Sequence, residues 1–233
     1  MVIHHPQTAL EAVQIRKGSP EDTVYLAGGT DDLRLGGGAE GKELIDINTL
    51  NEPYNTITEK DGKVWIGARC TLQQVVESEL VPGFIREAAA FCSSFTRRNS
   101  ATIGGNVALR RQDSYTAAAL TAAEAVLMST TPHGENEKPI GEYLQSDCKR
   151  FIRYIVVDKD RTGWVKRFGN TSASHAALIA AESQGVYALS VSGSAFTYGN
   201  TPELAKEMAF TDDITGSAVY KKYLAKTVFT LGR

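Results

Sequence analysis

The sequence of 233 residues lacks the features that most directly assign a function. Its three cysteines and four histidines show none of the short spacings of zinc, iron–sulfur or redox-disulfide motifs, so no metal site is expected. No apolar run approaches the roughly 20 residues that cross a bilayer. The first residues, MVIHHPQTALEAV, lack a basic segment followed by an apolar one, so we expect no secretory signal and a cytoplasmic location.

An excess of charge of one sign is also missing. The chain has 25 Lys and Arg against 27 Asp and Glu, which gives a net charge of −2. Nucleic-acid-binding domains normally carry a basic excess, so no nucleic-acid partner is expected. Hydrophobic residues make up 42% of the chain and charged residues 22%, as in ordinary globular proteins. The length is sufficient for one large domain or for two or three small ones.

Local patterns alternate between helix and strand without a regular βα repeat, which favours an α+β fold. Thr8 with Glu11, and Thr71 with Gln74, have the spacing of a capping box at a helix start. DRTG at 160–163 is typical of a hairpin turn. The first two strands, with a loop and a short helix between them, would form a small βαβ-like unit. Helices are expected at 9–17, 72–80, 83–94, 114–125, 202–210 and 217–229, and strands at 23–27, 42–47, 63–68, 151–158, 164–169 and 187–196. Residues 126–130 form an apolar run without an assigned element.

Two Gly-Gly pairs stand in similar settings, LAGGTDD at 26–32 and ATIGGNV at 101–107. Each follows a short apolar run and precedes a polar residue, so each is expected to form a loop at a strand end. Without Cβ atoms, the backbone N–H groups can approach a phosphate and a positive φ is accessible. Thr30 and Asn106 can add side-chain hydrogen bonds. We hypothesise two loops that face one diphosphate; the alternative is two ordinary turns.

A third glycine cluster, GGGAEG at 36–41, formally matches G-x-G-x-x-G. The dinucleotide fingerprint requires a strand before the glycines and a helix after them. The segment that follows, KELIDI, alternates like a strand. A Rossmann domain is therefore not expected.

Five segments together resemble a known family. LAGGTDDL, LIDINTL, WIGARCTLQQV, ATIGGNVA and DDITGSAVYKKYLA occur in one order along nearly the whole chain. This ordered set is similar to the FAD-binding (medium) subunit of the molybdenum hydroxylases, which include xanthine dehydrogenase and the carbon monoxide dehydrogenase medium chain. The ordered set is far more specific than either glycine pair alone.

The resemblance implies an α+β flavoprotein of the PCMH (vanillyl-alcohol-oxidase)/CO-dehydrogenase type. Two α+β subdomains, 1–55 and 56–160, would clasp FAD, and a small, shortened α+β domain would follow at 161–233. The first glycine segment would cradle the pyrophosphate, Ile103 would lie against the flavin, and Asp113 would accept hydrogen bonds from the sugar-like part. Asp113 and Thr71 have an alternative role as helix caps. The implied cofactor-binding residues are Ala27, Gly28, Gly29, Thr30, Asp31, Gly67, Ala68, Thr71, Thr102, Ile103, Gly104, Gly105, Asn106 and Asp113.

The resemblance also implies an electron-transfer role. A flavin performs redox chemistry itself, so no catalytic side chain is expected. In the family, a molybdenum-cofactor subunit oxidises the substrate and an iron–sulfur subunit passes electrons to FAD, which delivers them onward, commonly to NAD. The chain would be one oxidoreductase subunit, active in a complex with these partners.

Departures from the family keep other interpretations open. Arg167 matches a basic family position, but Thr171 and His175 replace an Arg and an Asp, which changes the charge expected near the flavin. Arg110 and Arg111 are unexpectedly basic; they are either a solvated pair or a clamp for phosphate or a partner. A degenerate member that serves as a scaffold is the alternative function. A stand-alone flavin reductase of the related type used in cell-wall precursor reduction is less consistent, since its proton-donating Ser and Glu have no evident counterparts.

Overall fold

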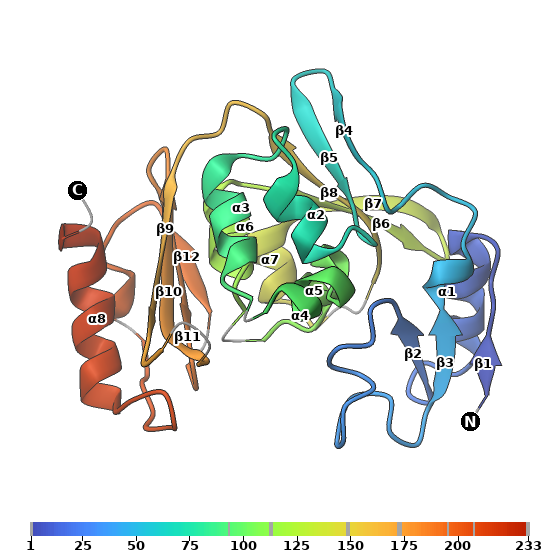
Figure 1. Cartoon of the computed structure of the whole chain (residues 1–233), viewed down its shortest axis with the longest axis horizontal. Helices are drawn as coiled ribbons and strands as arrows, with labels where there is room; N and C mark the ends of the chain where they lie inside the picture. The colour runs from blue at the N-terminus through green and yellow to red at the C-terminus, as the bar shows by residue number, and fades with distance from the viewer. Residues whose placement is uncertain are drawn as a thin grey trace.

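Three β-sheets lie side by side along the long axis of the molecule, and the two chain ends are at opposite ends of it (Figure 1). The computed structural model describes residues 2–92, 94–111, 114–147, 150–171, 174–194, 196–206 and 208–231. Each sheet takes its strands from one consecutive stretch of chain: β1–β3, β4–β8 and β9–β12. The α+β fold class is confirmed, and the domain boundaries at 55/56 and 160/161 stay predictions.

The first sheet is parallel, in the order β1-β3-β2. Thr8 begins the first helix as predicted, since its side chain accepts a hydrogen bond from Glu11 N. The carboxylate of Glu11 reaches back to Gln7 N at 2.7 Å rather than to Thr8 N, so only half of the capping box forms. The prediction of a short helix between β2 and β3 is wrong, because residues 30–42 form successive turns. The elements are β1 (Ile3–His4), α1 (Ala9–Gly18), β2 (Thr23–Leu26), β3 (Glu43–Asp46) and the 3₁₀ turn η1 (Ile47–Thr49).

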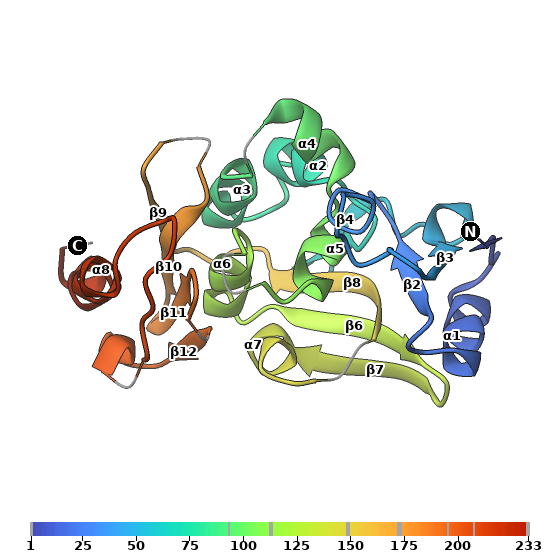
Figure 2. The same cartoon turned by 90° about the horizontal axis from the view of Figure 1, so that it is seen from below.

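The middle sheet is antiparallel, in the order β4-β5-β8-β6-β7. Helices cover one face of it, as the view from below shows (Figure 2). Here the capping box predicted for Thr71 and Gln74 forms in full at the start of α2. The elements are β4 (Ile57–Lys60), β5 (Lys63–Gly67), α2 (Leu72–Glu77), α3 (Gly83–Ala90), α4 (Phe95–Ser100), α5 (Ile103–Ala108), α6 (Ala117–Ala122), β6 (Val126–Thr131), β7 (Gly134–Pro139), α7 (Ile140–Leu144) and β8 (Phe151–Asp158).

The third sheet is antiparallel, in the order β12-β11-β10-β9. The predicted hairpin at 160–163 is wrong: β8 pairs within the middle sheet and β9 with β10, so this segment links two sheets. The helix expected at 202–210 is reduced, among the described residues, to one 3₁₀ turn. The elements are β9 (Trp164–Gly169), β10 (Ala176–Ser183), β11 (Val186–Val191), β12 (Thr197–Gly199), η2 (Leu204–Lys206) and α8 (Ala218–Leu231).

β10 joins the third sheet to its neighbours on both faces. Leu178 and Ala180 pack in a cluster with α8, whereas Ile179 and Ala181 belong to the large core of the middle unit. Because side chains alternate between the two faces of a strand, a strand that is buried on both faces is apolar throughout. This accounts for the run AALIAA, which the sequence analysis did not identify as a strand.

The C-terminal signature DDITGSAVYKKYLA anchors α8. The carboxylate of Asp212 accepts a hydrogen bond from Ala218 N at 2.6 Å, at the start of the helix. Nζ of Lys221 is fully buried and lies 2.6 Å from the carboxylate of Asp213. Burial opposes ionisation of Asp213, but hydrogen bonds from Lys221, Thr215 and the Ser192 hydroxyl outweigh it and hold the pKa of this carboxyl below its usual range. The motif therefore has a structural role in fixing the last helix.

The described residues contain neither a helix suited to a membrane span nor a cluster suited to a metal ion. No helix in the described ranges has the length and apolar character that a membrane span requires. His, Cys, Asp and Glu side chains in the same ranges form no group of three that could hold a metal ion.

Candidate functional site: a cleft between the sheets

The first glycine pair forms a loop at the end of β2. Gly29 adopts a positive φ of 64°, which favours glycine. A Cβ on Gly28 would lie 1.8 Å from the carbonyl oxygen of Ser100, so this glycine allows the loop to approach the segment before α5. Within the described chain, the backbone N–H groups of residues 28–32 have no hydrogen-bond acceptor. These N–H groups make the loop a suitable cradle for an anion.

The second glycine pair is not a loop, which corrects the prediction. Gly104 and Gly105 lie in the first turn of α5, whose N-cap is Thr102. The N–H groups of residues 103–106 are already bonded, to Cys70 O, Ala68 O, Thr102 Oγ1 and Thr102 O respectively. A Cβ on Gly104 would lie 2.6 Å from that of Ala68, so core packing explains this glycine. The backbone N–H groups of the second pair therefore do not form a second anion cradle.

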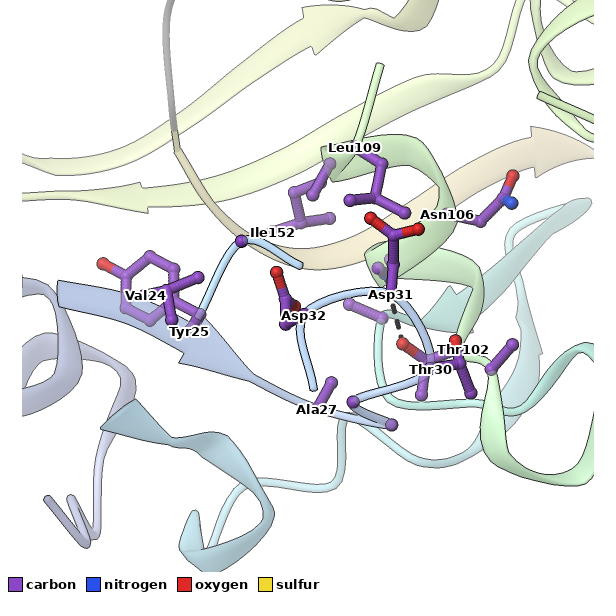
Figure 3. A pocket seen from close by; sticks show the side chains of 18 of the residues that line it. Val24, Tyr25, Ala27, Thr30, Asp31, Asp32, Thr102, Asn106, Leu109 and Ile152 are labelled. Atoms are coloured by element: carbon purple, nitrogen blue, oxygen red, sulfur yellow. Dashed lines mark hydrogen bonds between the residues drawn. The ribbon is translucent and has the colours of Figure 1, made fainter. Parts of the chain in front are cut away.

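A cleft of about 480 Å³ lies between the first sheet and the middle unit, and His175 of the β9–β10 connection also lines it. Figure 3 shows Ala27, Thr30 and Asp31 of the first loop facing Thr102 and Asn106 of α5. Other residues in the lining are Arg16, Tyr25, Asp32, Lys42, Cys92, Arg97, Leu109, Arg111, Arg150, Phe151, Ile152 and His175.

Most of the predicted cofactor-binding residues line this cleft. Gly67, Thr71 and Ile103 do not: Gly67 packs on the backbone of Tyr54, Thr71 caps α2, and Ile103 is fully buried in the core. Asp113 lies outside the described residues. The predicted residues in the lining are Ala27, Gly28, Gly29, Thr30, Asp31, Ala68, Thr102, Gly104, Gly105 and Asn106.

Asn106 connects α5 to the next helix. Its Oδ1 accepts hydrogen bonds from the hydroxyl groups of Ser114 and Thr116, at 2.8 and 2.6 Å. Its Nδ2 donates to none of the residues that the structure describes. The oxygen thus holds the segment after α5 in place, and the nitrogen is available as a donor to a ligand.

The lining carries more positive than negative charge, although the whole chain is slightly acidic. Five basic side chains, Arg16, Lys42, Arg97, Arg111 and Arg150, face two carboxylates, Asp31 and Asp32.

The negative charge of both carboxylates in the lining is reduced, by ion pairs at Asp31 and by a raised pKa at Asp32. Oδ1 of Asp31 lies 3.1 Å from Arg34 Nε and 3.2 Å from Arg111 Nη1. Burial, and then the neighbouring Asp31, raise the pKa of Asp32, which Lys42 partly opposes. The surplus of positive charge favours an anionic ligand.

One end of the cleft has an aromatic wall that the sequence analysis missed. The rings of Tyr25 and Phe151 pack edge to face with centroids 5.2 Å apart. The guanidinium of Arg16 lies 5.0 Å from the centre of the Tyr25 ring and donates to Thr23 O at 2.6 Å. Burial raises the pKa of Tyr25 to about 12 despite Arg16. Such a wall suits a planar ring system.

The two arginines left open by the sequence have different roles. Arg110 donates to the carbonyl of Ser146 and lies 4.3 Å from the centre of the Tyr143 ring, so it holds local structure. Arg111 pairs with Asp31 across 80 residues and lines the cleft. Only Arg111 is therefore placed to contact a ligand.

The third sheet contributes to the cleft through the connection between β9 and β10. Arg167 donates to the carbonyl oxygens of Thr171 and Ser174, and Thr171 and Ser174 exchange side-chain to backbone hydrogen bonds of 3.0 Å. This network orders the chain next to His175, which lines the cleft. Of the two departures in this segment, His175 therefore lines the cleft, whereas Thr171 does not.

Comparisons with known proteins identify the family. Residues 1–157 match the family model described as the FAD binding domain in molybdopterin dehydrogenase. The protein YgfM of Escherichia coli K12 is 26% identical over 94% of this chain and 90% of its own length. The carbon monoxide dehydrogenase medium chain of Hydrogenophaga pseudoflava is 30% identical, over 60% of this chain and 52% of that one.

A solved structure shares the fold. The CO dehydrogenase structure from Oligotropha carboxidovorans matches with a TM-score of 0.84 and 19% identity, over 98% of this chain and 94% of that one. At this identity the match shows the fold alone. The family match over residues 1–157 goes further: the chain belongs to the FAD-binding domain family of the molybdopterin dehydrogenases, and its cofactor is FAD.

Proposed function

We propose that the chain holds FAD in this cleft and serves as the electron-transfer subunit of a molybdenum hydroxylase-type oxidoreductase. Electrons enter from an iron–sulfur partner and leave to an acceptor such as NAD. The observation that carries the proposal is the first loop, where unbonded N–H groups of residues 28–32 open into a cleft with surplus positive charge.

The residues present fit FAD. The loop N–H groups and Arg111 would bind the diphosphate, and the aromatic wall of Tyr25 and Phe151 would contact a ring system. Asn106 Nδ2 would donate a hydrogen bond from the opposite side. FAD supplies the redox chemistry when bound, and these residues bind it, orient it and shield it from water.

The division of labour among subunits follows from cysteine chemistry. An iron–sulfur cluster is generally held by four thiolates, and this sequence has three cysteines. Cys70 and Cys92 are buried on separate segments, Cys70 beside α2 and Cys92 after α3. We therefore assign the cluster, and the molybdenum cofactor that oxidises the substrate, to partner subunits.

The test compares FAD retention, read from flavin absorbance after gel filtration, in Gly105→Val and Gly83→Val. Both glycines lie in the first turn of a helix, but only Gly105 lines the cleft. A Cβ on Gly83 would meet only Nη2 of Arg86, at 3.9 Å, and a Cβ on Gly105 would meet only Oγ1 of Thr102, at 2.9 Å, so the Thr102 side chain must shift slightly. Gly104→Val is unsuitable, since it would collide with Ala68 in the core. We expect Gly105→Val to lose FAD and Gly83→Val to retain it. Equal retention would overturn the binding model, and a parent chain that retains none would favour the scaffold role.

The acceptor is tested separately on the FAD-loaded chain without oxygen. NADH transfers a hydride, equivalent to two electrons and a proton. Bleaching of the flavin bands by NADH would show electron exchange between NADH and the flavin, and would support NAD as the acceptor of electrons from the reduced flavin. Unchanged bands with NADH, but bleaching by dithionite, would overturn NAD as the acceptor and leave FAD binding intact.

A further inference from the structure

A side chain continues the hydrogen bonding between β2 and β3 past the last residue pair of the two strands. Leu26 pairs with Asp46 where both strands end, and the chain then enters the turn η1. Asn48, in this turn, donates from Nδ2 to the carbonyl oxygen of Ala27 at 3.0 Å. Ala27 lines the cleft (Figure 3) and directly precedes the unbonded N–H groups of the first loop. The start of this loop is therefore held by an asparagine side chain.

A second acceptor fixes the orientation of the Asn48 amide. Oδ1 of Asp46 accepts hydrogen bonds from Nδ2 of Asn48 at 2.9 Å and from its backbone N at 3.0 Å. The carboxylate of Asp46 and the carbonyl of Ala27 can only accept, so the amide nitrogen, and not the amide oxygen, must face them. An aspartate at this position would have no hydrogen to donate, and a serine would have one instead of two. The bridge between the two strand ends thus depends on the two hydrogens of the amide nitrogen.

The backbone around Asn48 is bonded to the middle unit. Arg69 donates from Nη2 to the carbonyl oxygen of Asn48 at 3.2 Å, and from Nη1 to that of Leu50 at 3.1 Å. The chain neighbours of Arg69 are Ala68 and Cys70, whose carbonyl oxygens accept two N–H groups of the first turn of α5 at 2.9 Å. Arg69 therefore connects Asn48 to the segment that also holds α5, the opposite wall of the cleft.

The bond to Ala27 also determines where the next N–H group points. In a trans peptide, the C=O of one residue and the N–H of the next lie in one plane and point in opposite directions, and the described chain has no cis peptide. Asn48 does not line the cleft, whereas Ala27 and Gly28 do. Asn48 thus binds Ala27 O from the side away from the cleft, which directs the N–H group of Gly28 towards the cleft. Because glycine allows this peptide to rotate, its orientation depends on such a hydrogen bond.

We infer that Asn48 is a positioning residue for the diphosphate of FAD, an inference that rests on the proposed function. Its side chain holds the peptide between Ala27 and Gly28 so that the N–H group faces the cleft before FAD enters. Such preorganisation of a loop increases affinity, because less conformational freedom is lost on binding. Asn48 acts through the loop and does not contact the cofactor, since it lies outside the lining.

The test compares Asn48→Ala with the control Asn51→Ala. Asn51 follows shortly after Asn48, is also exposed, and has its Nδ2 3.5 Å from Gln7 Oε1, outside the cleft. Each variant and the parent are measured in three ways: the FAD dissociation constant by flavin fluorescence, the phosphorus NMR spectrum of bound FAD, and the midpoint of urea unfolding without FAD. The phosphorus spectrum reports on the surroundings of the diphosphate alone.

We expect Asn48→Ala to weaken FAD binding about fivefold, the equivalent of one net hydrogen bond, and to move the phosphorus resonances of bound FAD towards those of free FAD. Its urea midpoint should equal that of Asn51→Ala, because Asn48 is exposed and water replaces the lost bonds. Equal FAD affinities of the two variants would overturn the inference. Weaker binding with unmoved phosphorus resonances, or with a lowered urea midpoint, would also overturn it, since either result shows a merely structural role. A parent chain that binds no FAD would instead refute the proposed function.

Discussion

Asp213→Asn should destabilise the C-terminal unit, because it leaves the ammonium group of Lys221 without a counter-charge inside the protein. The Lys221 side chain is fully buried, and its Nζ lies 2.6 Å from Asp213 Oδ2. Its other contacts are the carbonyl oxygens of Ser192 and Thr211, at 2.9 and 3.0 Å. Removal of one partner from a buried ion pair costs about 3–5 kcal/mol, since the remaining charge stays uncompensated.

The assay is urea and thermal unfolding followed by fluorescence. Trp164 is a local probe, because its ring packs 5.8 Å from that of Phe229 on α8. A loss of about 3–5 kcal/mol should lower the melting temperature of a chain of this size by roughly 6–20 °C. The control is Asp160→Asn, at an exposed position. A loss below about 1 kcal/mol, the range of exposed ion pairs, would refute the argument.

A double variant separates the charge from the packing. Lys221→Met in the Asp213→Asn background removes the buried charge together with its counter-charge and fills a similar volume. Replacement of a buried pair by apolar groups is often close to neutral. The double variant should therefore be more stable than Asp213→Asn alone. If it is less stable, the hydrogen bonds of Lys221 to the backbone matter more than its charge.

The same pair predicts an acid transition. The ordinary pKa of an aspartate is 3.8, and that of Asp213 in the folded chain is lower. The unfolded chain then binds more protons below pH 3.8, so the contribution of Asp213 to stability is complete above that pH and is lost as the pH falls through the folded value. The parent should lose stability on acidification below about pH 4 more steeply than Asp213→Asn.

Three further predictions concern other parts of the chain. Gly28→Ala should weaken FAD binding about tenfold, because a Cβ 1.8 Å from Ser100 O must displace the loop. The control Gly18→Ala, at a position with open space around it, should leave FAD affinity unchanged. Fluorescence titration with FAD measures the affinity of both variants. Cys70, whose pKa burial raises to about 11, should resist alkylation at pH 8 until the chain unfolds, as site-resolved mass spectrometry can check. Thr71→Ala should cost about 1 kcal/mol of unfolding free energy, because it removes the side-chain cap of α2; a cost near zero would show that the cap contributes nothing.

Features encoded by neighbouring residues were predicted well. The strand at 151–158 matches β8 residue for residue, since its apolar run ends at a charged turn. The capping box at Thr71 formed because Gln74 lies within reach of the same helix turn. At Thr8 only one of the two predicted hydrogen bonds formed, because the Glu11 carboxylate accepts from Gln7 N instead of from Thr8 N. Local hydrogen bonds offer a choice between adjacent N–H groups that spacing alone does not decide.

Features that depend on distant partners were not predictable in this way. A turn sequence at 160–163 looks the same whether the next strand pairs back or enters another sheet, and here β9 pairs with β10. The sequence of β10 lacks the alternation of apolar and polar residues that marks a half-buried strand, because both of its faces are covered. The two helices that cover them, α6 and α8, are separated by about 100 residues of sequence. Pairing partners, and not local propensity, decided both.

The two Gly-Gly pairs have different structural roles although their sequences are alike. Gly28 and Gly104 both lack room for a Cβ, but the obstacle is Ser100 O in one case and Ala68 in the other. The first contact lets two units of the fold approach each other at the cleft, and the second packs α5 on its own core. A ligand-binding glycine and a packing glycine are identical in sequence, so only the neighbour in space distinguishes them. This is why Gly105, which lines the cleft and has only Thr102 Oγ1 near its missing Cβ, is the position where a substitution tests FAD binding rather than folding.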